Sequence, residues 1–116
     1  MRHRMNKAVL SRTKGPREAL LRNLATSVIL YEKVKTTKAR AKLVRPLIEK
    51  AITIGRSNSL ASRRRLLQLF MVGNAVKKII EDLGPKYKER KGSYTRIIPL
   101  KRREGDAAEI VQIELV

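Results

Sequence analysis

The stretch AEIVQIELV, residues 108–116, decides the fold class because its side chains follow a period of two. Val111, Ile113 and Leu115 alternate with Ile110, Gln112 and Glu114. In a strand, such alternation places the apolar residues on one face and the polar residues on the other. The sequence therefore predicts a β-strand with one buried face.

A second strand precedes it in the stretch SYTRIIPL, residues 93–100. The intervening REGD, residues 103–106, predicts a hairpin turn. Pro99 cannot donate a ladder hydrogen bond, so its strand should lie at a sheet edge or stop there. A third, short strand is predicted over 33–37, where Val34 alternates with lysines and two threonines follow.

Upstream of the hairpin, apolar residues recur at helical spacing. Helices are expected at 16–31, from a Thr37 cap to about 54, at 60–70, and at 75–83 with Gly84-Pro85 closing the last. The residues expected to face inward are Leu20, Leu24, Val28 and Tyr31; Ala39, Leu43, Leu47, Ala51 and Ile54; Leu60, Leu66, Leu67 and Phe70; and Val76, Ile79, Ile80 and Leu83.

This order of elements predicts a two-layer α+β fold, with helix, strand, three helices and two strands. The early strand should join the hairpin in a small three-stranded sheet covered by helices on one face. Residues 16–116 form a single domain in this interpretation. Residues 1–15 form a basic extension with no acid, and ordering it requires a polyanion.

Charge indicates the kind of partner. The 116 residues hold 28 Lys plus Arg and 10 Asp plus Glu, a net charge of +18 with a pI near 11.2. The surplus positive charges repel one another in the free protein and attract phosphates strongly. Nucleic acid is therefore the first partner to consider.

Catalysis has little support. The chain has no Cys, and its one histidine, His3, has no nearby carboxylate. The acids are scattered beside Lys or Arg, and no phosphate loop or dinucleotide fingerprint occurs. We expect no enzyme activity, no cofactor and no metal.

The absence of Cys fits a reducing, cytosol-like compartment, and no apolar run is long enough to span a bilayer. An organellar transit peptide is an alternative interpretation of the basic start.

Three basic clusters are the candidate RNA-binding regions. They comprise Arg2, Arg4, Lys7, Arg12, Lys14 and Arg17 in the extension; Arg63, Arg64 and Arg65; and Lys86, Lys88, Arg90, Lys91, Arg96, Lys101, Arg102 and Arg103. One such run often is only a solvated surface, but three on a small domain are harder to dismiss. Consecutive arginines on a helix cannot all face the core, so 63–65 should reach solvent. Tyr87 and Tyr94 lie among the last cluster, where a ring stacks on bases or belongs to the core.

In this order, several short motifs resemble the bacterial large-subunit ribosomal protein L17 family. They are MRHR (1–4), ALLRNLA (19–25), KTT (35–37), RPLIEKAIT (45–53), RR within 63–65, YTR (94–96), GDAAE (105–109) and IELV (113–116). Each motif is weak alone, but together they cover essentially the whole chain. Two departures are Gly15-Pro16, where the family usually has Ser-His, and Ser93, where it usually has a second Gly.

The resemblance implies a structural component of the large ribosomal subunit, located in the cytoplasm. It would bind large-subunit ribosomal RNA near the exit of the nascent-chain tunnel and touch neighbouring ribosomal proteins. Its implied fold agrees with the one predicted above. By motif, the candidate RNA contacts are Arg2, His3, Arg4, Arg12, Arg17, Arg22, Thr36, Thr37, Arg64, Tyr94, Thr95 and Arg96.

A DNA-binding regulator is the main rival, because the helices at 60–70 and 75–83 are joined by a short turn with Gly73. The second helix, however, has only Lys77 and Lys78 as long basic donors. A nucleic-acid enzyme lacks any acid–base or metal constellation.

Overall fold

The computed structural model describes residues 14–70 and 72–116, and the predicted extension therefore lies almost wholly outside the described residues. The elements are α1 Lys14–Tyr31, β1 Lys33–Thr37, α2 Lys38–Gly55, α3 Leu60–Phe70, α4 Gly73–Lys78, the π-helical η1 Ile79–Leu83, α5 Gly84–Lys86, β2 Thr95–Arg102 and β3 Glu109–Leu115. The predicted α+β class and the order of its elements are confirmed.

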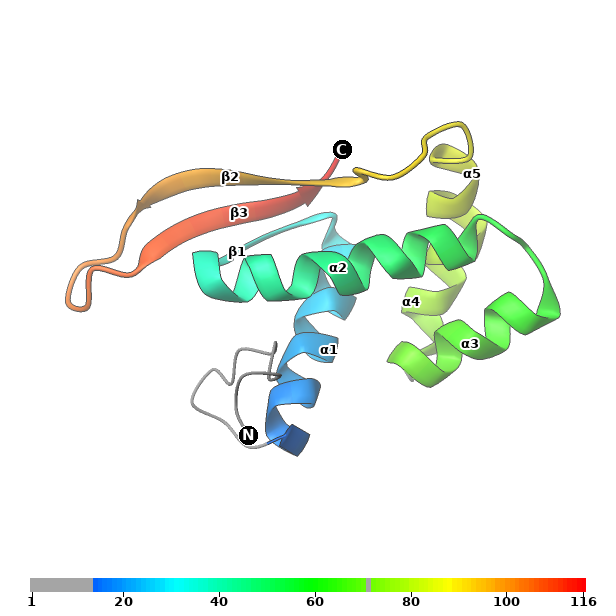
Figure 1. Cartoon of the computed structure of the whole chain (residues 1–116), viewed down its shortest axis with the longest axis horizontal. Coiled ribbons are helices and arrows are strands. Elements are labelled where there is room, and N and C mark those ends of the chain that lie inside the picture. Colours follow the sequence, from blue (N-terminus) through cyan, green and yellow to red (C-terminus); the bar gives the residue numbers. More distant parts are fainter. Residues whose placement is uncertain (1–13, 71) are drawn as a thin grey trace, which may run out of the picture.

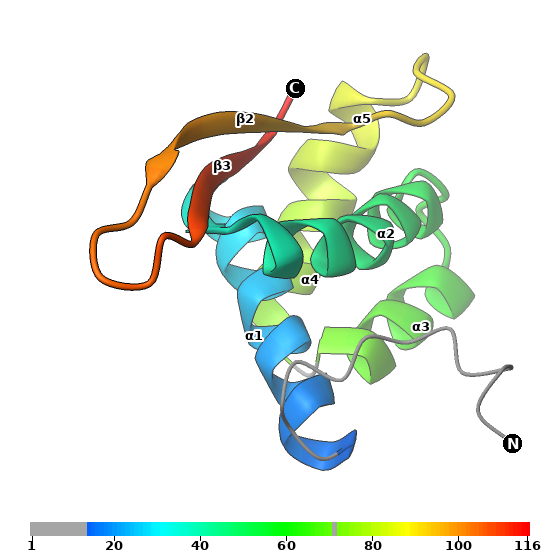
Figure 2. The same ribbon diagram turned by 60° about the vertical axis from the view of Figure 1, so that its left-hand side comes forward.

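The three strands form an antiparallel sheet in the order β1-β3-β2. The described helices all lie on one side of this sheet, and the far end of the β2–β3 hairpin projects beyond them (Figures 1 and 2). Pro99 lies on the edge strand β2, where the ladder shifts register between Pro99 and Lys101. The edge position expected for this proline is confirmed.

The core lies between the sheet and the helices. Val111, Ile113 and Leu115 of β3 are buried, as their period of two predicted. They face α2, whose buried residues include Val44 and Ile48. The four inward residues predicted for the last helix, namely Val76, Ile79, Ile80 and Leu83, are also buried.

Several inward predictions were wrong. The side chains of Tyr31, Leu60 and Leu67 are 72%, 63% and 42% exposed. In α2, Ala39 is exposed. The buried face of that helix runs through Ala41, Val44, Ile48, Ala51 and Ile52, of which only Ala51 was predicted to face inward. Because α2 packs against the sheet on one side and against α1 on another, apolar residues surround much of its circumference, and their spacing alone does not identify the most buried stripe.

The expected stop at Gly84-Pro85 was also wrong, because the chain stays helical to Lys86. Gly84 has right-handed helical dihedrals, and its lack of a side chain serves close packing. A Cβ atom there would collide with the backbone carbonyl oxygen of Gly55 at the end of α2. Thr37 occupies the cap position of α2, but its side chain makes no capping hydrogen bond.

Candidate nucleic-acid interface

The first basic surface is the arginine run of α3. Arg63, Arg64 and Arg65 are exposed, while Leu66 and Phe70 on the same helix are buried. The prediction that the run reaches solvent is confirmed. Within residues 14–70 and 72–116, no ion pair to a carboxylate is found for any of the three. Their guanidinium groups remain available to a polyanion.

The second basic surface is the side of the sheet away from the helices, which we call the outer sheet face. Its cations are Lys33 and Lys35 of β1 and Arg96 of β2, all exposed. Lys33 and Arg96 are both paired in register with Glu114 of the central strand. The Arg96 Nη2 atom lies 2.9 Å from the Glu114 carboxylate. Two hydrogen bonds lower the pKa of this carboxyl group: the one from Gln112 has the larger effect, and the one from Arg96 comes second. The two outer strands thus place cations on one open face, on either side of Glu114 of the central strand.

The third basic surface is the tip of the hairpin, where most charges are paired. Arg102 lies 3.4 Å from Glu109, and Arg103 forms a two-point contact with Asp106. The Arg103 hydrogen bonds, followed by the Ala108 backbone N–H, lower the pKa of Asp106 from 3.8 to about 2. Lys101 has no carboxylate partner among the described residues. The tip therefore presents fewer unneutralised charges than its composition predicts.

The burial of Tyr94 and Thr95 argues against the side-chain RNA contacts predicted there. Their exposed fractions are 1% and 2%, and Tyr87 is only 3% exposed. The two tyrosine rings pack together with centroids 5.3 Å apart, and the Tyr94 hydroxyl accepts a hydrogen bond from Arg56. A nucleotide cannot reach these side chains. The core alternative for Tyr94 is correct because its ring fills the interior and its hydroxyl is satisfied there.

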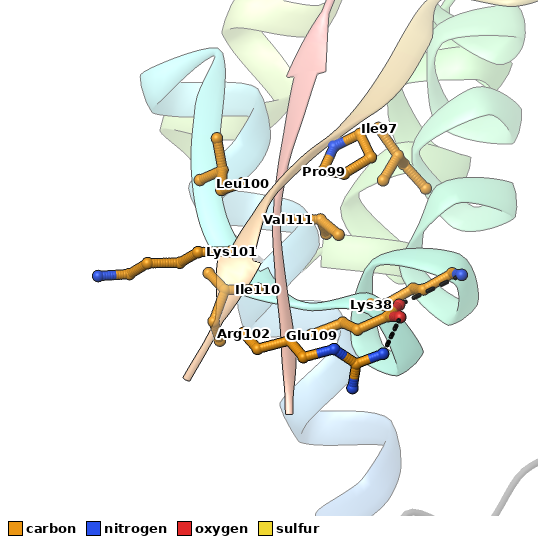
Figure 3. Close-up of a pocket in the computed structure, with 9 residues that line it drawn as sticks. All are labelled: Lys38, Ile97, Pro99, Leu100, Lys101, Arg102, Glu109, Ile110 and Val111. Atoms are coloured by element: carbon orange, nitrogen blue, oxygen red, sulfur yellow. Dashed lines mark hydrogen bonds and ion pairs between the residues drawn. The ribbon is translucent and has the colours of Figure 1, made fainter. Parts of the chain in front are cut away.

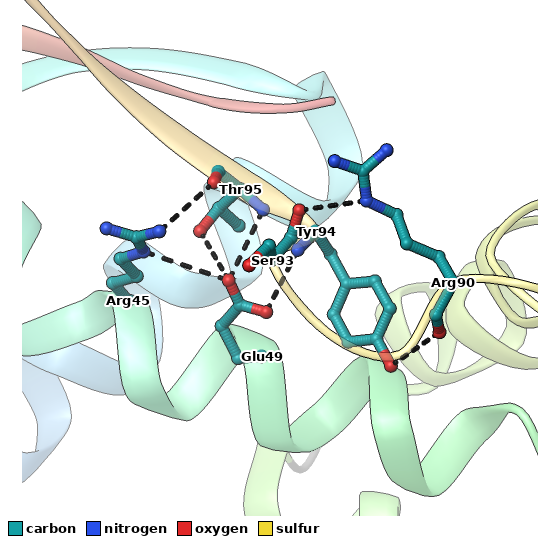
Figure 4. Close-up of polar contacts among 6 residues, drawn as sticks. All are labelled: Arg45, Glu49, Arg90, Ser93, Tyr94 and Thr95. Carbon is teal, nitrogen blue, oxygen red and sulfur yellow. Dashed lines mark hydrogen bonds and ion pairs between the residues drawn. The ribbon is translucent and has the colours of Figure 1, made fainter.

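The signal that sequence reasoning missed is Glu49 of α2. Its carboxylate accepts hydrogen bonds from the Tyr94 backbone N–H at 3.0 Å and the Thr95 hydroxyl at 3.0 Å, with a longer contact of 3.4 Å to the Thr95 N–H. Figure 4 shows Arg45 on the other side of this carboxylate, at 3.7 Å. One acid thus anchors the start of β2 to α2, although its spacing from other acids gave no indication of a role.

The remaining predicted contacts divide by location. Arg17 and Arg22 lie half-buried on α1, and Thr36 and Thr37 lie half-buried on the edge strand β1. Arg2, His3, Arg4, Lys7 and Arg12 lie outside the described residues, as does the side chain of Lys14.

A recess of about 430 Å³ lies under the projecting hairpin, between its inner face and the start of α2 (Figure 3). Ile97, Pro99 and Val111 line its apolar part. At its rim, the Glu109 carboxylate bridges Lys38 and Arg102 at 3.3 and 3.4 Å. One carboxylate balances only one of these two cations, so the rim keeps a net positive charge. The lining contains no nucleophile paired with a base.

The part of the chain covered by residues 14–70 and 72–116 shows no site for a metal ion, since no three His, Cys, Asp or Glu side chains are grouped there to hold one. No helix among these residues is long and apolar enough to cross a membrane. Fold and surface together define a class: a small, strongly basic α+β protein whose cations are presented on open surfaces suited to a polyanion.

Comparisons with known proteins identify the family. The family model described as "Ribosomal protein L17" matches residues 20–116. The chain is 48% identical over 107 residues to the large ribosomal subunit protein bL17 of Desulfitobacterium hafniense, covering 92% of this chain and 96% of the relative. It is 44% identical over 117 residues to the bL17 protein of Hydrogenobaculum sp. and 43% identical over 116 residues to that of Dehalococcoides mccartyi, in both cases covering 100% of this chain and 99% of the relative. The chain belongs to the ribosomal protein L17 family, and the resemblance seen in its motifs is confirmed.

Proposed function

We propose that this chain is a structural, non-enzymatic constituent of the large ribosomal subunit in the cytoplasm. It binds large-subunit ribosomal RNA near the exit of the nascent-chain tunnel and contacts neighbouring ribosomal proteins. The observation that carries the proposal is the full-length similarity to proteins named for the large subunit. The net charge of +18 supports an RNA partner, because neutralising phosphates releases counterions and drives association.

The distribution of cations supports RNA over duplex DNA. In a helix-turn-helix regulator, the second helix projects into the major groove. Here α4 and η1 are packed into the core through Ala75, Val76 and Ile79. Lys78 donates a hydrogen bond to the Leu30 carbonyl at 3.0 Å, so it too is turned toward the protein. The rival regulator is therefore disfavoured by the burial of its would-be recognition helix.

The α3 arginine run offers a quantitative test. Replacing Arg63, Arg64 and Arg65 together by glutamine should weaken binding to purified large-subunit ribosomal RNA. It should also reduce the slope of log K against log salt by about 0.7–0.9 for each phosphate that the variant no longer neutralises. The matched control is the triple Arg→Lys variant, which keeps the charge and should keep most of the slope. An unchanged slope in the glutamine variant would exclude this helix from the RNA interface.

Two further measurements test the proposal as a whole. The protein should sediment with large subunits from a cell lysate through a moderate-salt wash. Deleting residues 1–13, which leaves α1 intact, should lower RNA affinity, because the segment contributes Arg2, Arg4, Lys7 and Arg12 without any acid. Equal competition by duplex DNA at physiological salt would instead favour the regulator.

A further inference from the structure

The aromatic residues are unequally buried. The chain has three tyrosines and one phenylalanine. Phe70, Tyr87 and Tyr94 are at most 3% exposed, whereas Tyr31 is 72% exposed. Aromatic rings contribute most to stability when buried, so a ring left in water gives up that contribution. Among residues 14–70 and 72–116, Tyr31 is thus the one aromatic ring that a partner can reach.

Tyr31 is held at a sharp turn between α1 and β1. The next residue, Glu32, has a φ of 66°, in the left-handed region that side chains with a Cβ rarely adopt. The turn persists because its backbone is bonded on both sides: the Glu32 N–H donates to Val28 at 2.7 Å, and the Glu32 carbonyl accepts from Leu115 at 2.9 Å. A backbone conformation that is unfavourable in this way persists only where surrounding contacts hold it in place, and such residues are often found at functional sites.

Side chains brace the same turn. Lys78 donates to the Leu30 carbonyl and lies 3.7 Å from the Glu32 carboxylate, with Lys86 at 4.0 Å from its other oxygen. Consequently the residues on either side of Tyr31 are tied to α4, α5 and β3. The backbone that presents the exposed ring is therefore pre-organised, which lowers the entropic cost of binding through it.

The turn also leads directly onto the outer sheet face. Lys33 and Lys35 follow Tyr31 at steps of two and are both exposed, and Arg96 lies in the same cross-strand row as Lys33. A ring followed by a row of cations is the arrangement with which proteins bind unpaired nucleotides: the ring stacks on a base and the cations contact the adjoining phosphates.

We propose that Tyr31 stacks on an unpaired base of the RNA, with the adjoining phosphates on Lys33 and Lys35. The inference rests on the proposed function, since it names one nucleotide contact within the RNA interface. It assigns base recognition to the exposed ring at the α1–β1 turn, and to neither of the buried rings among the last basic cluster.

The chain has no Trp, so a Tyr31→Trp variant provides a single fluorescent reporter. Adding purified large-subunit ribosomal RNA should quench its emission, because stacking places the indole against a base. The control is Asn58→Trp, at an exposed loop position between α2 and α3, which should be quenched far less. If emission at position 31 changes only in assembled subunits and never with RNA alone, the ring contacts a protein and the proposal is overturned.

Affinity measurements separate stacking from charge. Tyr31→Leu should lose about 5- to 150-fold in RNA affinity, the range for one base stacked on one ring. Its salt slope should be unchanged, because stacking releases no counterions. Tyr31→Phe keeps the ring and should bind like the wild type. Tyr31→Gln, a polar replacement at this exposed position, should repeat the loss with an unchanged melting temperature.

The outcomes distinguish this inference from the proposed function. Wild-type affinity in both Tyr31→Leu and Tyr31→Gln, alongside selective RNA binding by the wild type, would overturn the stacking assignment and leave the proposed function standing. A loss matched by Tyr31→Phe, or one accompanied by a lower melting temperature, would also overturn it. Absence of selective RNA binding by the wild-type protein would overturn the proposed function itself.

Discussion

Replacing Glu49 by alanine should destabilise the domain by about 2–4 kcal/mol. The carboxylate accepts two good hydrogen bonds at 3.0 Å, from the Tyr94 N–H and the Thr95 hydroxyl. Because Tyr94 and Thr95 are almost wholly buried, water replaces the missing acceptor only in part. Leaving a buried donor unsatisfied costs about 1–3 kcal/mol per group, so two such groups cost about 2–6 kcal/mol. The Glu49 side chain is 21% exposed, so water entering beside position 49 offsets the upper part of that range.

The assay is urea denaturation of the full chain. With a slope of about 2 kcal/mol per molar urea, the middle of the usual range of about 1–3, the transition midpoint of Glu49→Ala should fall by about 1–2 M. Glu49→Gln keeps one acceptor oxygen and should lose roughly half as much. Glu81→Gln is the matched control: this glutamate is exposed on η1, and its free energy of unfolding should stay within about 0.5 kcal/mol of the wild type. A Glu49→Ala protein as stable as the control would refute the reasoning.

Two other predictions concern packing and pH. Gly84→Ala should destabilise the protein by about 1–3 kcal/mol in thermal unfolding, because the new Cβ meets the Gly55 carbonyl, whereas Gly73→Ala, with open space around it, serves as the control and should not clash. An NMR titration should give Asp106 a pKa of about 2, moving toward 3.8 in Arg103→Gln. Since folding lowers this pKa, the contribution of the ion pair to stability is complete above about pH 4 and is lost as the pH falls through 2. An Asp106 pKa that is the same in the wild type and in Arg103→Gln would contradict this prediction.

The stabilising contacts bear on the interface indirectly. Glu49 fixes the first residues of β2, and β2 in turn carries Arg96 onto the outer sheet face. Gly55 and Gly84 allow α2 and η1 to approach closely, which helps position the helices beneath the sheet. Disrupting either arrangement should therefore weaken RNA binding only as far as it loosens the fold, without the change in salt slope expected for an arginine of α3.

Local sequence patterns and composition were sufficient to predict these helices and strands and the kind of partner. The period of two in β3, the alternation over Lys33–Thr37 and the helical spacing of the last helix all appear in the structure where they were predicted. These features depend on neighbours along the chain, since backbone geometry sets which side chains share a face. Net charge likewise is a property of composition, and it indicated a polyanion without any coordinates.

The exposure of individual residues depended on contacts between distant segments. Tyr31 was expected to face inward and is exposed, because the α1–β1 turn holds it outside. Tyr94 was left open between base stacking and the core, and Glu49 and Arg56, about 40 residues away, hold it in the core. Helical spacing places a residue on a face, but it does not say which face a sheet or a second helix will cover. That choice follows from how all the elements pack together, because burial is a property of the whole assembly of side chains and long-range hydrogen bonds leave no periodic trace in the sequence.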